Sequence, residues 1–430
     1  MKIIITALGS GGDVFPFIVL GQALQQRGHA VVLMANPHFA DAVAQAGLSL
    51  APLGTESDYL AFLQQPGIWD NQSGFRLIWR YLIDLTPRIL AAIEEYIIPG
   101  KTVLIGSTLS LATRLAQERH GLPATMIHLA PHCFLSAHAF PVTSTRPLPG
   151  WLPLWARWTL LTVMDRLLID ATCAKSLNAV RTSLDLPPVR SVMRRWLHSP
   201  DLTIGAFPAW FAAPQPDWPP SAIAAGFLQR HSPADNALPD SVQAFLDAGE
   251  PPLLFTPGTG MVQARAFFAC AVQTVAQLER RALFVTGFSE NLPDRLPPTI
   301  LTAAYLPFDQ LLPKVAAIIH HGGIGTVAAG LAAGIPQLVI PFAFDQFDNA
   351  VRVTRLGVGR NCAGLNPDHW AGALRELLHP DSSLTTAVRR CQRLMAEAPD
   401  IGVLIADRIE ALAATRLFGA STQNPGLFDE

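Results

Sequence analysis

Two histidines and three glycines follow an apolar run in the C-terminal half of the chain. The sequence IIHHGGIGT, residues 318–326, predicts a strand that ends at the histidines and a helix that begins near Thr326. Glycines let the backbone approach a ligand closely, and a helix N-terminus offers unpaired N–H groups with partial positive charge. With both histidines expected at the mouth of the turn and His321 as a further donor, the pattern indicates a phosphate site. The alternative is a tight turn in which the glycines are only structural.

Two other loops carry chemistry that would complement a phosphate site. The stretch FTPGTG is a second strand-to-glycine turn, where Gly258 and Thr259 either bind phosphate from the opposite side or form an ordinary turn. The stretch PFAFDQFDNA follows another strand, and its Asp345 and Gln346 can accept from and donate to the hydroxyls of a sugar. Capping of the following helix by Asp345 is the alternative there.

One carboxylate stands alone at the first turn of the chain. The stretch SGGDVFP places Asp13 between a predicted strand over 2–8 and a predicted helix over 15–27. A carboxylate at this turn can act as a general base or can cap the helix. The helix N-terminus would keep Asp13 ionised and lower its basicity, whereas burial beside Phe15 would oppose that effect.

Several other kinds of site are missing from the sequence. The second strand ends VVLMAN without the acid of a dinucleotide site, and no GxGxxG, GxxxxGKS/T or GxSxG motif occurs. No Asp-x-Asp pair stands at a strand end, so a catalytic metal is not expected. The five cysteines are scattered and form no CxxC, which argues against a zinc site or a disulfide framework. We therefore expect no metal and no cofactor.

These groups require an alternating fold to position them. Short apolar runs alternate with helical stretches, and the pattern restarts after a proline-rich stretch over 207–240. Such alternation predicts an α/β protein with two doubly wound parallel sheets, which bind ligands at the carboxyl ends of their strands. The expected domains are an N-terminal domain over 1–230 and a C-terminal domain over 231–400. A last helix and tail over 401–430 are expected to pack back on the N-terminal domain.

The composition agrees with a large folded enzyme. The chain has 430 residues, half of them apolar and 15% charged, with a net charge of −2. This excludes disorder and a general nucleic-acid binder, and the short apolar N-terminus predicts a cytoplasmic protein without a signal peptide. The stretch WLPLWARWTLLTVMDRLLID over 151–170 is expected to form a buried or half-buried helix. The alternative is a helix that lies on the inner membrane and would suit a greasy substrate.

Taken together, these stretches resemble the family 1 nucleotide-sugar glycosyltransferases, which have the GT-B fold of two Rossmann-like domains facing across a cleft. The similarity is strongest over 305–350, and GSGGDVFPF resembles the start of the bacterial and sterol-type branch. Stretches such as GIWD and LWARWTLLTVMDRLLIDATCAKSLNAVR are similar to the rhamnosyltransferases of rhamnolipid biosynthesis and to bacterial lipid-type glucosyltransferases.

The resemblance implies an acceptor-binding N-terminal domain and a donor-binding C-terminal domain. It implies a donor site at Gly12, Gly258, Thr259, Tyr305, His321, Gly323, Gly325, Thr326, Asp345 and Gln346. In that site Tyr305 stacks on the nucleotide base and the residues around His321 hold the diphosphate. Asp345 and Gln346 bind the hydroxyls of the sugar. The acceptor is expected near Phe15, Trp69 and His132.

Two positions depart from the family pattern. Many relatives have a catalytic histidine in the place of Asp13 and a downstream aspartate that orients it, which matches a position near Ser107 here. A carboxylate base needs no such partner, so the two changes agree. The ribose-binding glutamate of the plant enzymes matches Ala329, which would tolerate a deoxyribose nucleotide.

The function implied is an inverting, metal-independent hexosyltransferase with Asp13 as general base. It would move a hexosyl or deoxyhexosyl group from dTDP-rhamnose or UDP-glucose to the hydroxyl of a lipid-like acceptor such as a 3-hydroxyacyl chain. The alternatives are a nucleotide-sugar epimerase on the same fold and a non-catalytic helper subunit of a transferase.

Overall fold

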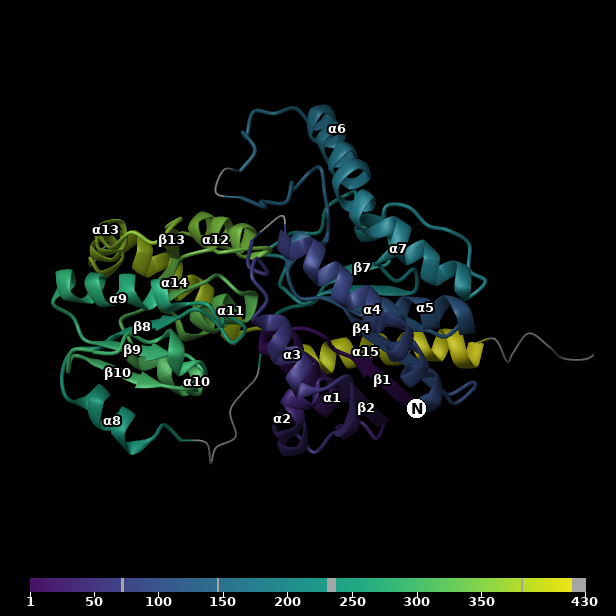
Figure 1. Ribbon diagram of the computed structural model, residues 1–430, viewed down its shortest axis with the longest axis horizontal. Coiled ribbons are helices and arrows are strands. Elements are labelled where there is room, and N and C mark those ends of the chain that lie inside the picture. Colours follow the sequence, from purple (N-terminus) through teal and green to yellow (C-terminus); the bar gives the residue numbers. More distant parts are fainter. Residues whose placement is uncertain (71–72, 145–146, 230–236, 380–381, 420–430) are drawn as a thin grey trace, which may run out of the picture.

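The computed structural model describes residues 1–70, 73–144, 147–229, 237–379 and 382–419 and contains two parallel β-sheets (Figure 1). The N-terminal lobe holds the first sheet, in the order β3-β2-β1-β4-β5-β6-β7, and the C-terminal lobe holds the second, in the order β10-β9-β8-β11-β12-β13. Helices cover both sheets (Figure 1). This confirms the predicted α/β class with two doubly wound sheets.

The strands and helices of each lobe alternate along the chain. The N-terminal lobe contains the strands β1 (Lys2–Thr6), β2 (Ala30–Ala35), β3 (Ser49–Pro52), β4 (Thr102–Ser107), β5 (Ala124–His128), β6 (Leu202–Gly205) and β7 (Ala222–Ala224). Its helices are α1 (Gly11–Gln26), α2 (Ala40–Gln45), α3 (Glu56–Leu63), α4 (Ser73–Tyr96), α5 (Leu111–His120), α6 (Leu154–Met164) and α7 (Asp170–Ser183). The strands of the C-terminal lobe are β8 (Leu253–Thr256), β9 (Ala282–Val285), β10 (Ile300–Ala303), β11 (Ala317–His320), β12 (Gln337–Val339) and β13 (Gly359–Asn361). Its helices are α8 (Asp240–Asp247), α9 (Arg265–Leu278), α10 (Phe308–Leu311), α11 (Ile324–Ala333), α12 (Gln346–Arg355), α13 (Pro367–Leu378) and α14 (Ser382–Ala396).

The buried strand β1 explains why the N-terminal lobe forms around the first residues of the chain. Ile3 and Ile5 point into one apolar cluster of the core and Ile4 points into another, because successive side chains of a strand face opposite sides of the sheet. Both faces are covered, which is the usual state of a parallel sheet. The strand therefore fixes the position of the turn that carries Asp13.

The last helix, α15 (Ile401–Ala413), returns to the N-terminal lobe and packs against α1 (Figure 1). Its Ile405 and Ile409 belong to the same apolar cluster as β1, and Glu410 accepts hydrogen bonds from Arg27 and pairs with His29. The polypeptide thus crosses between the lobes twice.

Some predicted elements differ from the structure. Helix α1 begins at Gly11 instead of residue 15, so Asp13 lies in the first helical turn and not in the loop before it. The proline-rich stretch contains β7, a three-residue strand at the edge of the sheet, where the missing N–H groups of proline are tolerated. The predicted domain boundary at residue 230 lies outside the described residues.

The aromatic stretch over 151–170 is helical but is not a core helix. Only Leu161 and Asp165 in it are fully buried, and α6 projects away from the sheets (Figure 1). Among the residues that the structure describes, no helix combines enough length and hydrophobicity to cross a bilayer.

Candidate active site

A cavity of about 950 Å³ lies between the lobes, at the carboxyl ends of strands from both sheets. Strand order reverses between β1 and β4 and between β8 and β11, and ligands bind at such points in open α/β sheets. All the residues predicted for the base, the donor and the acceptor line this cavity, the last group being Phe15, Trp69 and His132. The fold therefore brings together groups that lie more than 300 positions apart in the sequence.

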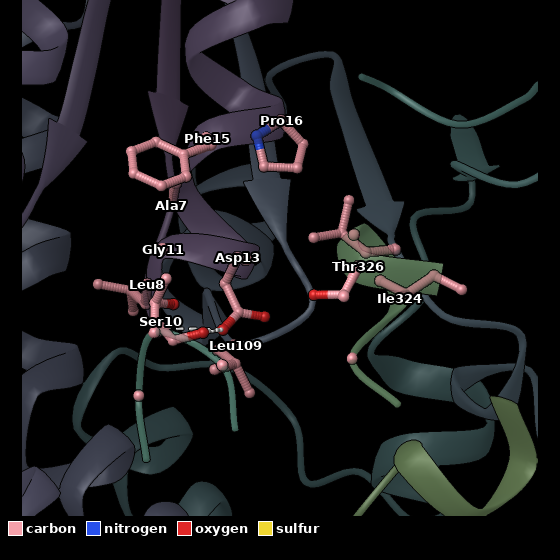
Figure 2. Close-up of a pocket in the computed structure, with 18 of the residues that line it drawn as sticks. Ala7, Leu8, Ser10, Gly11, Asp13, Phe15, Pro16, Leu109, Ile324 and Thr326 are labelled. Carbon is pink, nitrogen blue, oxygen red and sulfur yellow. Dashed lines mark hydrogen bonds between the residues drawn. The ribbon is translucent and has the colours of Figure 1, made fainter. Parts of the chain in front are cut away.

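Asp13 is held at the start of α1 by the residue that caps that helix. The backbone N–H and the hydroxyl of Ser10 both donate to Oδ2 of Asp13, at 2.8 and 3.0 Å. The other carboxylate oxygen points across the cavity toward Thr326 of the C-terminal lobe (Figure 2). Asp13 thus caps the helix with one oxygen and presents the other to the cleft.

Burial controls the basicity of Asp13. Desolvation raises the pKa of its carboxyl above the ordinary value, although the two hydrogen bonds from Ser10 act in the opposite direction. A carboxylate with a raised pKa is a stronger base once it is deprotonated. Burial therefore outweighs the hydrogen bonds from Ser10 in setting the pKa of Asp13.

Gly9 makes room for this carboxylate, a role that was not predicted from the sequence. Its φ is +123°, a conformation that L side chains rarely adopt, and a Cβ at this position would collide with Oδ2 of Asp13. The glycine-rich spacing GSGGD was a signal for such a close approach.

An aromatic wall stands beside Asp13 in the N-terminal lobe. The ring of Phe15 packs edge-on against Phe39, with 6.0 Å between centroids, and Phe39 packs in turn against Tyr59 at 5.9 Å. Burial, followed by the charge of Asp13, raises the pKa of the Tyr59 hydroxyl, which keeps that group protonated. Tyr59 lies on α3, a helix that the sequence did not reveal.

In the C-terminal lobe, the ring of His321 fills the space that two glycines leave open. A Cβ at Gly258 or at Gly323 would collide with this ring, so both positions exclude any side chain. Burial lowers the pKa of His321 to about 4, so the imidazole is neutral near pH 7 and carries one N–H donor. Its Nδ1 is buried and has no hydrogen-bond partner among the described residues. An unpaired buried polar atom in a cleft is a group that a ligand can satisfy.

The neighbouring His320 has a different role, because it faces the core. The backbone N–H of Gly322 donates to its Nδ1 at 3.1 Å, which places the proton on Nε2, and Nε2 then donates to Oε1 of Gln337 at 3.0 Å. The expectation that both histidines stand at the mouth of the turn is therefore wrong for His320.

Helix α11 presents an open N-terminus to the cavity. Its N-cap is Gly323, which has no side chain to satisfy the first N–H groups of the helix. Gly325 is exposed, and a Cβ built there would meet no atom within 4 Å, so the fold itself does not require glycine at this position. Thr326 follows in the same turn. Tyr305, at the far side of the cavity, has 53% of its surface exposed, and its ring is free to stack.

The sugar-binding pair of the prediction is held by its own loop and helix. Oε1 of Gln346 accepts hydrogen bonds from the backbone of Phe342 and Ala343, at 2.8 and 3.1 Å, so only its amide nitrogen is left to donate. Nδ2 of Asn349 donates to Asp345 at 2.8 Å and to the carbonyl of Gly322 at 2.9 Å. Asn349 therefore links the loop of Asp345 to the turn that contains Gly322. Its position four residues after Asp345 on a helix was the signal for this contact.

Asp345 and Asp13 approach each other from opposite lobes. Burial raises the pKa of Asp345 to about 7, and the charge of Asp13 adds to the effect. Cys133 lies near both carboxylates, and burial together with those charges raises its pKa to about 12. Its thiol therefore stays protonated.

Trp69 belongs to the N-terminal lobe, but its ring packs mainly against residues of the C-terminal lobe. Its ring lies 6.1 Å from that of Phe344, and a Cβ at Gly260 would touch it at 3.4 Å. Phe344 has a φ of +57°, an uncommon conformation for a residue with a side chain, directly before Asp345. Trp69 thus couples the loop of Asp345 to the N-terminal lobe.

The N-terminal half of the cavity is apolar and extends along α4. Its wall includes Phe62, Phe75, Ile78, Leu82, Leu85 and Ile89, with Met193 at the same end. Burial lowers the pKa of His132, the predicted acceptor residue, which keeps its imidazole neutral. An apolar molecule would fit this half of the cavity, and Arg88 of α4 is the charged residue in this stretch of the lining.

Two facing Rossmann-like lobes with a ligand cavity between them define the GT-B architecture. Residues 3–137 match the glycosyltransferase family 28 N-terminal domain, and residues 276–412 match the C-terminal domain of erythromycin biosynthesis protein CIII-like proteins. The chain is therefore a glycosyltransferase of the GT-B fold. These matches favour a transferase over the epimerase and the helper subunit.

Individual relatives agree with this assignment. The O-mycaminosyltylonolide 6-deoxyallosyltransferase of Streptomyces fradiae is 28% identical over 92% of this chain and 94% of its own length. The sterol 3-beta-glucosyltransferase UGT80B1 of Arabidopsis thaliana is 27% identical over 89% of this chain and 63% of its own length. The similarity to rhamnosyltransferases of rhamnolipid biosynthesis stays a prediction.

Solved structures share the fold at low sequence identity. The glycotransferase of kitacinnamycin superimposes with a TM-score of 0.71 at 22% identity, covering 96% of this chain and 99% of its own. The spinosyn rhamnosyltransferase SpnG, complexed with thymidine diphosphate, gives a TM-score of 0.64 at 19% identity, covering 95% and 99%.

Proposed function

We propose that this glycosyltransferase moves a hexosyl or deoxyhexosyl group from a nucleotide sugar to the hydroxyl of a lipid-like acceptor, with inversion at the anomeric carbon. One observation carries the proposal. A half-buried carboxylate of the N-terminal lobe faces an open helix N-terminus of the C-terminal lobe across one cavity, and the cavity continues into an apolar channel.

The proposed reaction takes one step. Asp13 accepts the proton of the acceptor hydroxyl while that oxygen forms a bond to the anomeric carbon, and the bond from this carbon to the diphosphate oxygen breaks. The negative charge that develops on the diphosphate is held by the N-terminus of α11 and by the N–H of His321. In this proposal the helix and His321 take the part that a metal ion plays in other transferases.

The donor in this proposal is dTDP-rhamnose or UDP-glucose. Ala329 lines the cavity where a ribose clamp would stand, which leaves a deoxyribose nucleotide acceptable. The spinosyn rhamnosyltransferase, a structure with the same fold, holds thymidine diphosphate. Asp345 and the amide nitrogen of Gln346 would bind the hydroxyls of the sugar.

A 3-hydroxyacyl chain is the proposed acceptor. The channel along α4 supports it because aliphatic and aromatic side chains bind a hydrocarbon chain without the cost of burying polar groups. The sterol glucosyltransferase relative supports an apolar alcohol in general.

The test is a product assay with the purified full chain. The protein is incubated with a panel of UDP- and dTDP-sugars and with a 3-hydroxyacyl lipid. The products are identified by mass spectrometry, and their anomeric configuration and any epimer are determined by NMR spectroscopy. A glycosylated lipid of opposite anomeric configuration to the donor is the expected product. Donor turned into an epimer in the absence of acceptor would replace the proposal with the epimerase alternative.

A further inference from the structure

The segment around α6 carries an unusual amount of exposed apolar surface. Of the large apolar side chains that are exposed in the described part of the chain, most lie between residues 148 and 168. We call six of them the apolar ridge, namely Trp151, Trp155, Leu160, Val163, Leu167 and Leu168. Trp151 exposes 80% of its surface and Trp155 exposes 72%.

Three of the six ridge residues follow one side of a projecting helix, and the other three lie beside that side. Trp155, Val163 and Leu167 are spaced by multiples of four, so they share a face of α6 and the π-helical turn that continues it through Asp165–Ile169. In Figure 1 this helix stands clear of both sheets. An apolar face of this size is rare on the surface of a protein unless it binds something.

The charges around the ridge have one sign. Asp165 is 2% exposed, and Asp170 accepts hydrogen bonds from the backbone of Ser191 and Val192, at 2.7 and 2.9 Å, so neither carboxylate is presented with the ridge. Arg166 is exposed between ridge residues, and Arg194 stacks on Trp158 of α6 at 4.6 Å. With the exposed Arg195, which lies near Asp165 at the end of α6, these arginines form a basic rim.

The ridge and the apolar channel lie on two sides of the same elements. Met193 lines the cavity, and the next residue, Arg194, contacts α6. Trp79 lines the cavity from α4, and its Nε1 donates to the hydroxyl of Ser176 on α7 at 2.9 Å. Elements that line the channel therefore also contact α6 and α7, which places the projecting helix next to the channel.

We propose that the apolar ridge and its basic rim dock the protein on an anionic lipid bilayer. A helix with tryptophan and leucine on one face and arginine beside them binds at the interface of such a membrane, where tryptophan sits at the level of the headgroups. The bilayer then holds the channel close to a source of apolar alcohols. Only this last consequence rests on the proposed function.

A second copy of the chain would bind the ridge less well than an anionic bilayer does. A twofold contact through the ridge would bring Arg166 of both copies into one apolar interface, where neither Asp165 nor Asp170 is available as a counter-charge. Anionic headgroups supply that counter-charge, and each arginine near such a surface strengthens binding.

Vesicle sedimentation with the full chain tests the docking. The probes are vesicles of phosphatidylcholine alone and of phosphatidylcholine mixed with phosphatidylglycerol. We expect binding to the mixed vesicles, weakened by salt, and a loss of roughly 10-fold or more in the triple variant W151S/W155S/L167S. The matched control is the variant I98S/V403S, which removes exposed apolar side chains elsewhere and should bind like wild type.

The remaining outcomes separate docking from self-association and from activity. The proposal is overturned if the wild-type protein does not bind the mixed vesicles. It is also overturned if the control variant loses as much binding as the triple variant. If light scattering shows that the wild-type protein is a dimer and the triple variant a monomer, and neither binds vesicles, the ridge is an interface with a second copy. Transfer to a short water-soluble hydroxy acid should be unchanged in the triple variant. Vesicle binding without any transfer would retain the docking and remove the proposed function.

Discussion

After β1 the N-terminal lobe places a carboxylate at the start of a helix, whereas after β11 the C-terminal lobe places an imidazole and glycines at the start of a helix. Both turns lie where the strand order of their sheet reverses. The difference between them lies in how each helix N-terminus is satisfied. In α1 the carboxylate of Asp13 pairs with Ser10, whereas in α11 Gly323 offers no capping side chain.

The capped N-terminus of α1 and the uncapped N-terminus of α11 therefore have different roles, although both follow a strand of a parallel sheet. The closed terminus fixes the direction of a carboxylate, whose second oxygen is left for a proton (Figure 2). The open terminus keeps its N–H groups for an anion. Substitutions that change one of these two termini at a time separate their roles.

Replacement of Asp13 by asparagine should have the largest effect. The variant D13N keeps the shape and can still accept the hydrogen bonds of Ser10, but it cannot take a proton. We expect kcat to fall roughly 10²–10⁴-fold, the usual contribution of a general base. Affinity for UDP or dTDP, measured by titration calorimetry, should stay the same because the open terminus is untouched. Unchanged turnover would remove Asp13 from the mechanism.

The variant G9A should misplace the same carboxylate without removing it. The new methyl group collides with Asp13, and misplacement of a catalytic group by about 1 Å can cost ~10²-fold in rate. The matched control is G28A, at a glycine with a φ of +82° and no atom near its Cβ position, where only the backbone strain of about 1–2 kcal/mol is expected. Equal losses of kcat in the two variants would mean that strain, and not the position of Asp13, is responsible.

The variant G325A should close the open terminus. Its methyl group meets no protein atom, so the free energy of unfolding should not fall, but the methyl occupies space at the helix start. We expect affinity for the nucleoside diphosphate to drop about 10–200-fold, the range for one misfitting carbon. The control G372A, on α13 and also without close neighbours, should bind normally. Normal binding by G325A would place the diphosphate elsewhere.

Both helix N-termini could be predicted from the sequence, because a strand followed by a glycine turn is a pattern of neighbouring residues. The strand and helix alternation predicted both sheets, and the turns around Asp13 and His321 were found because their residues are contiguous. The inward rotation of His320 could not be predicted, because it depends on Gln337, a partner from the next strand. The same holds for Tyr59, which reaches Asp13 only through tertiary packing.

The exposed face of α6 marks another limit. Hydrophobic periodicity tells which residues share a helix face, but it does not tell whether that face is covered. The stretch over 151–170 therefore fitted a core helix as well as a surface helix. Only the three-dimensional arrangement distinguishes them, by leaving Trp151 and Trp155 exposed.

The smallest expected effect is on stability, and it concerns the second carboxylate of the cavity. Burial raises the pKa of Asp345 from 3.8 to about 7, so the folded protein keeps this proton at pH values where the unfolded chain has lost it. Stability contributed by the protonated form is therefore lost as the pH rises from the ordinary pKa to the raised one. The variant D345N is neutral throughout and can still accept the hydrogen bond from Asn349. Its melting temperature should exceed that of wild type by roughly 2–4 °C above the raised pKa and should match it below the ordinary one. The exposed carboxylate Asp84 provides the control, since D84N should show no such dependence. A gain that is the same at every pH would mean that the charge of Asp345 is not what the cavity disfavours.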